Sequence, residues 1–219
     1  MHPLDRPVWS ALTSRQASFA VGGGAALRFP ADVSPLAAGA DAAVVAALIP
    51  AGDDVSLLEA APPTAPAGVT VIRSALCVQM IAPCLAGGGA NVRLEPLNDA
   101  DAAEMLALAT LTRPGPFRAR THALGRFLGI RHGARLVAMA GERLNLDGFH
   151  EVSAVCTHPD YRGRGYGAAL MRAVAQRMLD QGDTPFLHSY ADNAPAIALY
   201  RSLGFDVRAE IIHAVWANA

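Results

Sequence analysis

A glycine-rich turn between an apolar strand and a helix is the part of this sequence best suited to chemistry. Residues 152–157 are typical of a strand, residues 166–179 are typical of a helix, and the sequence R-G-R-G-Y-G joins them at 162–167. Glycines at alternate positions allow a tight turn in which main-chain N–H groups approach an anion, and the positive end of the next helix faces the same anion. The segment therefore predicts a pyrophosphate site. The alternative is a structural turn that binds nothing.

A dinucleotide-binding fold is a competing interpretation, because Gly163, Gly165 and Ala168 also satisfy the pattern G-x-G-x-x-G/A. In that fold the first glycine follows its strand directly, within a series of βαβ units, and an acidic residue about 20 positions later binds the ribose. Here five residues, 158–162, separate the strand from the first glycine, and no repeated βαβ pattern follows. The spacing argues against a Rossmann fold.

The segment resembles the GNAT superfamily of N-acetyltransferases, in which the motif R/Q-x-x-G-x-G/A follows a strand. Residues 162–167 match this motif in full. Further agreement at 115–117, 136–143 and 193–205 extends the resemblance over residues 91–219. The resemblance is specific for the cofactor, acetyl-CoA, and says little about the acyl acceptor.

The resemblance also implies where the cofactor binds. In the family, the cofactor strand and the next strand (here 186–190) separate, and the pantetheine arm of coenzyme A lies between them, paired with main-chain groups of the cofactor strand. Asn193 would cap the following helix and hydrogen-bond the same arm. The cofactor-binding residues implied in this way are Val155, Cys156, Thr157, Arg162, Gly163, Arg164, Gly165, Tyr166, Gly167, Ala168 and Asn193.

Two side chains are implied as catalytic. Tyr200, seven residues beyond Asn193, matches a tyrosine with which many relatives protonate the sulfur of coenzyme A; the alternative is a packed aromatic residue. Glu151 stands where some relatives place a general base, although a glutamate there could simply be a solvent-facing residue of a strand. His188 is the alternative proton carrier. Cys156 is expected to be a small buried residue and not a nucleophile, because direct attack by an amine needs no enzyme thiol.

Patterns of apolar residues predict a mixed α+β fold with helices on both faces of a sheet, and the resemblance implies that this is a GNAT-like central, splayed mixed sheet. The proline- and glycine-containing run at 83–90 predicts a linker. It would join an N-terminal structural lobe (1–82), of degenerate acetyltransferase-like character, to a GNAT N-acetyltransferase domain (91–219). Strands are expected, among others, at 69–73, 76–81 and 92–95, and Asp41 is expected to cap a short helix.

Composition excludes several classes of protein. The chain has 219 residues, a formal net charge of −1 and 52% hydrophobic residues, and all 18 of its basic residues are arginine. This balance gives no electrostatic signal for nucleic acid or an anionic membrane. The three cysteines are scattered, so neither a disulfide framework nor a metal site is expected. No signal peptide or membrane span is recognised, and a cytoplasmic protein is expected.

The acceptor and any protein partner are less well defined by the sequence. Arg113, Arg118 and Arg120 lie on one predicted loop and favour an acceptor that carries a carboxylate or phosphate, although arginines on a loop are more often simply solvated. The apolar residues of the N-terminal lobe must pack against the catalytic sheet or against a second subunit, as in a homodimer.

The function predicted is transfer of an acetyl group from acetyl-CoA to a small-molecule or peptide amine, by direct attack in a ternary complex. Two alternatives stay open. One is a non-catalytic acyl-CoA-binding sensor, and the other is an interaction protein in which the N-terminal lobe covers the acceptor cleft.

Overall fold

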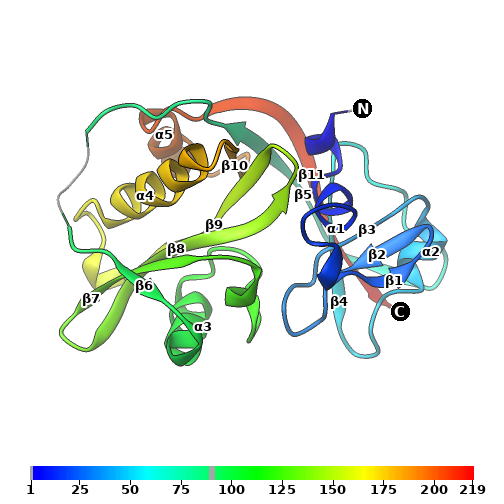
Figure 1. The fold of residues 1–219 in the computed structure, drawn as a ribbon. Helices are drawn as coiled ribbons and strands as arrows, with labels where there is room; N and C mark the ends of the chain where they lie inside the picture. Colours follow the sequence, from blue (N-terminus) through cyan, green and yellow to red (C-terminus); the bar gives the residue numbers. More distant parts are fainter. Residues whose placement is uncertain (1, 89–91) are drawn as a thin grey trace.

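An eight-stranded mixed β-sheet forms the centre of the protein (Figure 1). The computed structural model describes residues 2–88 and 92–219. In sheet order the strands are β4 (Asp54–Glu59), β11 (Asp206–Asn218), β5 (Val69–Ile81), β10 (Thr184–Tyr190), β9 (Phe149–Thr157), β8 (Arg135–Leu146), β7 (Phe127–His132) and β6 (Glu95–Leu97). Neighbouring strands are antiparallel except β9 and β10, which run parallel.

Helices cover both faces of this sheet, as predicted from the sequence. α4 (Tyr166–Asp180) and α3 (Ala102–Thr112) each pack on β8 and β9, and Figure 1 shows them on opposite sides of the sheet. Side chains alternate across a strand, so Ala138 and Ala140 of β8 join the core under α4, whereas Met139 between them packs with α3. α5 (Ala194–Ser202) follows β10 and adds to the core on the α4 side.

The sequence of α4 explains why this helix lies flat on the sheet. Leu170, Val174 and Met178 recur every four residues and are all fully buried, which is the spacing of one apolar helix face. Gly165, at the N-cap, has a positive φ of 76° that glycine adopts at little cost. The predicted strand-turn-helix order is therefore confirmed.

The N-terminal half is divided between two sheets. Its first part is a small lobe in which β1 (Val21–Gly23), β2 (Ala26–Arg28) and β3 (Ala37–Gly39) form a sheet beside the short helices α1 (Pro7–Leu12) and α2 (Ala42–Ala46). Asp41 caps α2 as predicted, by accepting a hydrogen bond from the main-chain N–H of Val44. β4 and β5 instead join the main sheet, where β5 lies between β11 and β10. The two strands expected at 69–73 and 76–81 are one strand, β5.

One hydrophobic core joins the two halves of the chain. Leu4, Leu12 and Phe29 from the small lobe pack in the same cluster as Leu144 and Phe186 of the main sheet. The lobe expected at 1–82 is therefore restricted to the residues before β4, because β4 and β5 find their strand partners in the C-terminal half.

Two further expectations concern the junction between the halves. Residues 89 and 90 of the expected linker, together with Asn91, lie outside the described residues. The strand expected at 92–95 is wrong: residues 92–94 have no strand assignment, and β6 begins at Glu95, where it pairs with Gly129 of β7. Pro96 fits this place, since β6 is an edge strand and proline lacks a hydrogen-bond donor.

We expect the fragment 92–219 to be poorly soluble when it is produced alone. Without β5, the strands β10 and β11 would both have an unpaired edge, and Phe186 and Ile211 would lose the buried cluster that they share with the small lobe. Solubility and thermal unfolding, measured beside the full chain, test this expectation.

A full chain with a protease site between Gly87 and Gly88 is the matched control, since a Cβ atom at either position would meet no atom of the described residues within 4 Å. After cleavage, its two pieces should stay associated and melt at nearly the temperature of the intact protein. A soluble, monomeric 92–219 fragment of full stability would contradict the shared core.

Candidate active site

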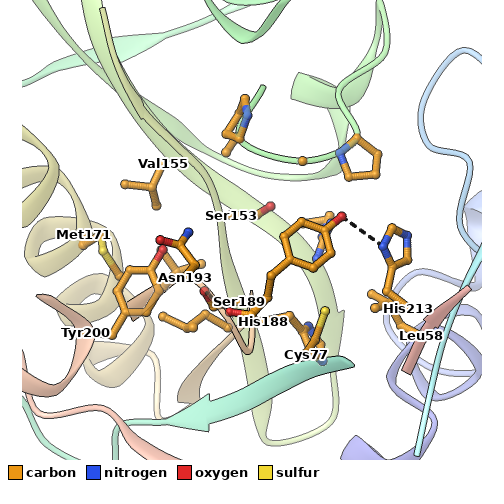
Figure 2. Close-up of a pocket in the computed structure, with 18 of the residues that line it drawn as sticks. Leu58, Cys77, Ser153, Val155, Met171, His188, Ser189, Asn193, Tyr200 and His213 are labelled. Atoms are coloured by element: carbon orange, nitrogen blue, oxygen red, sulfur yellow. Dashed lines mark hydrogen bonds between the residues drawn. The ribbon is translucent and has the colours of Figure 1, made fainter. Parts of the chain in front are cut away.

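β9 and β10 separate after a short stretch of pairing. Their parallel ladder covers only Thr184–Phe186 of β10 and Phe149–Glu151 of β9. Beyond it, residues 152–155 of β9 and 187–190 of β10 line a cavity of about 110 Å³ (Figure 2). The separation expected from the sequence is therefore present, and it leaves main-chain groups of both strands without a partner in the sheet.

A bulge in β9 helps to open this gap. Ser153 pairs with Gly141 and Cys156 with Met139, so that three steps along β9 match two along β8. The extra residue lies at Ala154, whose φ of 53° is in the left-handed region that L-residues rarely adopt. Bulges bend a strand and increase its twist, and strained backbone of this kind is concentrated at functional sites. The sequence gives no signal for it, because alanine has no preference for this conformation.

The glycine-rich turn stands beside the separated strands. Gly163 and Gly165 have φ values of 75° and 76°, and α4 begins at the next residue with no side chain capping its N-terminus. A Cβ atom at Gly167 would lie 3.9 Å from Cγ1 of Val155 in the cavity wall. The uncapped main-chain N–H groups of this turn are available to an anion.

Tyr200 and Asn193 both line the cavity (Figure 2). Asn193 accepts a hydrogen bond from the main-chain N–H of Ala196 at 3.4 Å and so caps α5, as expected. Burial raises the pKa of the Tyr200 phenol above its usual value, so the hydroxyl group is protonated at neutral pH. Tyr200 can therefore donate a proton inside the cavity.

Glu151 lies in the wrong environment for a general base. Its side chain is fully buried, does not line the cavity, and forms two hydrogen bonds of 2.7 and 2.6 Å with the guanidinium group of Arg143. Burial alone would raise the pKa of this carboxyl, but the charge and hydrogen bonds of Arg143, helped by His188, outweigh burial and lower the pKa to about 2. Such a carboxylate holds its partners in place and has little tendency to take up a proton.

His188 is fixed by the same network. Its Nδ1 lies 2.7 Å from Oε1 of Glu151, and its Nε2 lies 2.9 Å from Nε2 of Gln79. Because Arg208 donates to Oε1 of Gln79, the amide nitrogen of Gln79 faces His188 and donates to it. His188 therefore donates from Nδ1 and accepts at Nε2, so both of its nitrogens are already engaged.

Tyr190 and His213 form a further polar pair that the sequence analysis did not identify. The Tyr190 hydroxyl lies 3.2 Å from Nδ1 of His213 (dashed line in Figure 2). Burial, and then the positive charges of Arg143 and Arg73, lower the pKa of His213 to about 4, so its ring is neutral at pH 7. No motif marks these residues in the sequence, because they come together from β10 and β11 only when the sheet forms.

A second cavity, of about 450 Å³, adjoins the first. The two share Gly115, Pro116, Tyr190 and His213 in their walls. Tyr190 and His213 therefore border both cavities.

The three loop arginines expected near the acceptor have different environments. Arg118 lines the second cavity and pairs with Asp53 and Asp54 at 2.9 and 3.0 Å. Arg120 pairs with Asp32 at 3.1 Å and lines neither cavity. Arg113 lines the second cavity.

The two buried cysteines, Cys77 and Cys156, are poor nucleophiles in this environment. Burial raises the pKa of both Cys77 and Cys156 to about 11, so their thiols are protonated at neutral pH. Cys156 packs beneath α3 with Met105 and Ala154.

Over residues 2–88 and 92–219, no group of His, Cys, Asp and Glu side chains has an arrangement that could hold a metal ion. In the same residues, every helix is too short or too polar to cross a membrane.

Comparison with known structures decides the family. A GNAT-family protein from Novosphingobium aromaticivorans DSM 12444 is 42% identical, covers the whole of both chains and superimposes with a TM-score of 0.94. The chain belongs to the GNAT family. The family of FR47-like proteins also matches residues 127–217. The predicted family and the predicted GNAT fold are confirmed.

Curated relatives of this GNAT protein resemble it over shorter segments. Mycothiol acetyltransferase of Corynebacterium aurimucosum is 46% identical over 72 residues, which are 32% of this chain and 23% of that protein. The N-alpha-acetyltransferase RimI of Mycobacterium tuberculosis is 39% identical over 82 residues, 36% of this chain and 51% of that protein. The chain thus spans about a quarter and about half of these two relatives. Both are acetyltransferases, in agreement with the predicted enzyme class.

We expect Glu151→Gln to destabilise this GNAT protein by about 3–5 kcal/mol at pH 7, because Arg143 would be left buried without a counter-charge. The contribution of Glu151 should also depend on pH. Its folded pKa of about 2 lies below the reference value of 4.5, so its stabilisation is complete above pH 4.5 and is lost as the pH falls toward 2.

Urea denaturation of both proteins at pH 7, 5 and 3 measures the difference. The matched control is Asp32→Asn, which removes an exposed carboxylate from its pair with Arg120 and should change the unfolding free energy by less than about 1 kcal/mol. If wild type and Glu151→Gln differ in unfolding free energy by the same amount at pH 5 and at pH 3, this account is contradicted.

Proposed function

We propose that this GNAT protein transfers the acetyl group of acetyl-CoA to an amine, by direct attack of the amine in a ternary complex. The observation that carries the proposal is the parting of β9 and β10 beside the glycine-rich turn. Between the parted strands, main-chain groups of Val155, Cys156 and Thr157 are suited to pair with the amides of the pantetheine arm, as an added strand would. Asn193 supplies a side-chain amide at the same cavity.

The turn at residues 162–168 is the proposed pyrophosphate site. Its donors are main-chain N–H groups of the residues from Gly163 to Ala168, and the positive end of α4 adds to them. The left-handed backbone of Gly163 and Gly165 turns the chain within a few residues. The guanidinium group of Arg164 lies 4.9 Å from the ring centroid of Tyr161, which keeps a positive charge close to the turn.

Tyr200 is proposed as the acid of the reaction. The acetyl thioester supplies the electrophilic carbonyl, and its carbon–sulfur bond breaks as the carbon–nitrogen bond forms. The Tyr200 hydroxyl group, kept protonated by its raised pKa, can give its proton to the departing sulfur. The attacking nitrogen must lose a proton in the same reaction.

We propose Tyr190 and His213 as the acceptors of that proton, in place of Glu151. They border both cavities, so an amine that enters from the second cavity passes them before it reaches the first. The nitrogen can give its proton to Oη of Tyr190 while Tyr190 passes its own to Nδ1 of the neutral His213. Glu151 then acts as a positioning residue through Arg143 and His188, which do line the cavity.

Binding and turnover test the function in two steps. Calorimetry measures the affinity for acetyl-CoA, and a panel of small-molecule and peptide amines is then assayed for thiol release. The names of the curated relatives support both types of acceptor. Tight binding without turnover for any amine would favour an acyl-CoA-binding sensor instead.

We expect Gly165→Val to weaken coenzyme A binding about tenfold or more, roughly 1.4 kcal/mol. A Cβ atom would hinder the approach of the pyrophosphate, and valine is strained at the φ of 76° found there. Calorimetric titration gives the affinity, and circular dichroism shows whether the fold is kept.

Gly182→Val is the control at the opposite end of α4, where φ is 82° and an added Cβ would meet nothing within 4 Å. It carries the same kind of backbone strain but should leave coenzyme A affinity unchanged. Equal affinities of wild type and Gly165→Val would refute the pyrophosphate site.

Tyr200→Phe should lower kcat on the order of 100-fold and change the KM for acetyl-CoA little, because it keeps the ring and removes only the proton donor. Steady-state kinetics with saturating amine measures this effect. Tyr161→Phe is the control, since that hydroxyl contacts His132 and does not line either cavity. If chemistry limits the rate and Tyr200→Phe turns over as fast as the wild type, Tyr200 is not the acid.

A further inference from the structure

The second cavity is built by residues from both halves of the chain. Three adjacent strands each contribute one lining residue at the same level of the sheet. These residues are Ser56 of β4, Val215 of β11 and Arg73 of β5. His213 lies two residues from Val215, so the same face of β11 continues to the junction with the first cavity. The wall beside the junction is the segment that follows α3.

The charged side chains around this cavity are mostly arginines. Arg73, Arg113 and Arg118 line it, with Asp54 as the acidic member of the wall. Arg118 is neutralised by its contacts with Asp53 and Asp54. Within residues 2–88 and 92–219, neither Arg73 nor Arg113 has a carboxylate within ion-pair distance. Two positive charges therefore face this cavity without compensation.

Arg73 is held in a defined position at the junction. The carbon of its guanidinium group lies 4.3 Å from the ring centroid of Tyr190, the residue that contacts His213. An arginine stacked on an aromatic face keeps its N–H groups in the plane of the guanidinium, where they can donate two parallel hydrogen bonds to one oxyacid group.

Arg113 ends α3 in an unusual backbone conformation. Its φ and ψ are 51° and 57°, the left-handed region in which helices commonly end on glycine. Glycine would adopt this conformation at lower cost, whereas arginine places a guanidinium group at the wall of the cavity. Of the three loop arginines, Arg113 is the one without a carboxylate partner among the residues that the structure describes.

We infer that the acceptor carries an anionic oxyacid group, a carboxylate or a phosphate, which binds in the second cavity to Arg73 and Arg113. The amine of the same molecule then lies at the junction, next to Tyr190 and His213. This inference rests on the proposed acetyl transfer and names the substrate class of that reaction. It keeps Arg113 from the sequence-based hypothesis and replaces Arg118 and Arg120 by Arg73.

The environment of His213 agrees with this assignment. After burial, the charges of Arg143 and Arg73 lower the pKa of its ring. An anion bound to Arg73 offsets part of that positive field, so His213 becomes a better proton acceptor when the acceptor molecule is in place.

Matched pairs of amines test the inference. β-Alanine is compared with β-alaninamide, and phosphoethanolamine with ethanolamine, so that each pair differs in its anionic group and the two pairs separate carboxylate from phosphate. We expect the wild type to prefer the anionic member of at least one pair by about tenfold or more in kcat/KM, and Arg73→Gln and Arg113→Gln to bring that ratio toward one.

Arg120→Gln is the matched control, because Arg120 belongs to the same loop but lies outside both cavities and pairs with Asp32. It should keep the wild-type ratio. Wild-type ratios near one, or ratios that Arg73→Gln and Arg113→Gln leave unchanged, would overturn the inference while turnover of the neutral amines still supports acetyl transfer.

A binding measurement decides the case in which no amine of either kind is acetylated and the proposed function fails. N-acetyl-β-alanine and N-acetyl-β-alaninamide are titrated into the full chain in the presence of coenzyme A. Preference for the carboxylate that is lost in both arginine variants would keep the second cavity as an anion site. Equal binding, or none, would overturn it.

Discussion

The structure depends on the point at which the pairing of β9 and β10 stops. A central sheet normally satisfies every main-chain donor and acceptor of its inner strands, and buried polar groups left unpaired destabilise a fold. Here the ladder ends at Glu151 and Phe186, and the main-chain groups beyond it face a cavity. The unsatisfied groups are useful only if a ligand with its own donors and acceptors completes the sheet.

Glu151 links the strands at the point where β9 and β10 separate. It is the last residue of β9 paired with β10, and its carboxylate reaches Arg143 on β8 and His188 on β10. One buried anion thus ties three adjacent strands at the level where two of them part. The two strands separate after Glu151 and Phe186, while the residues before them stay paired. Removing one partner of a buried ion pair leaves the other charge without compensation, so the loss of Glu151 or of Arg143 alone destabilises the fold.

The sequence predicts the elements of the proposed cofactor site better than those of the proposed acceptor site. The glycine-rich turn, the strand before it and the helix after it are local features, and Tyr200 and Asn193 stand at fixed distances along the chain. The strand, Asn193 and Tyr200 line one cavity, and the turn lies beside it, because all of them belong to one βα unit and the helix after β10. The insertion of β5 between β11 and β10 is different, because alternating apolar residues show that a strand exists but not which remote strand it will pair with.

Two residues show where sequence reasoning fails on the site itself. For Glu151, the sequence leaves a solvent-facing position in a strand as the alternative to a general base. The solvent-facing alternative fails, because β9 is an inner strand whose two faces are both covered and the Glu151 side chain is fully buried. Arg73 gave no signal, since nothing near it in the sequence marks it as part of a site. It becomes notable only when β5 lies beside β10 and brings its guanidinium group over Tyr190.

The same sheet order brings the N-terminal half of the chain into the proposed acceptor site, which also includes Arg113. The glycine-rich turn, Asn193 and Tyr200 all follow residue 150, whereas Arg73, Ser56 and Asp54 precede residue 83. The two groups meet at Tyr190 and His213, because β5 pairs with both strands that carry these residues. A change in the N-terminal strands can therefore alter the acceptor cavity without touching the turn before α4. In this arrangement the N-terminal half both completes the core and contributes to the wall of the second cavity.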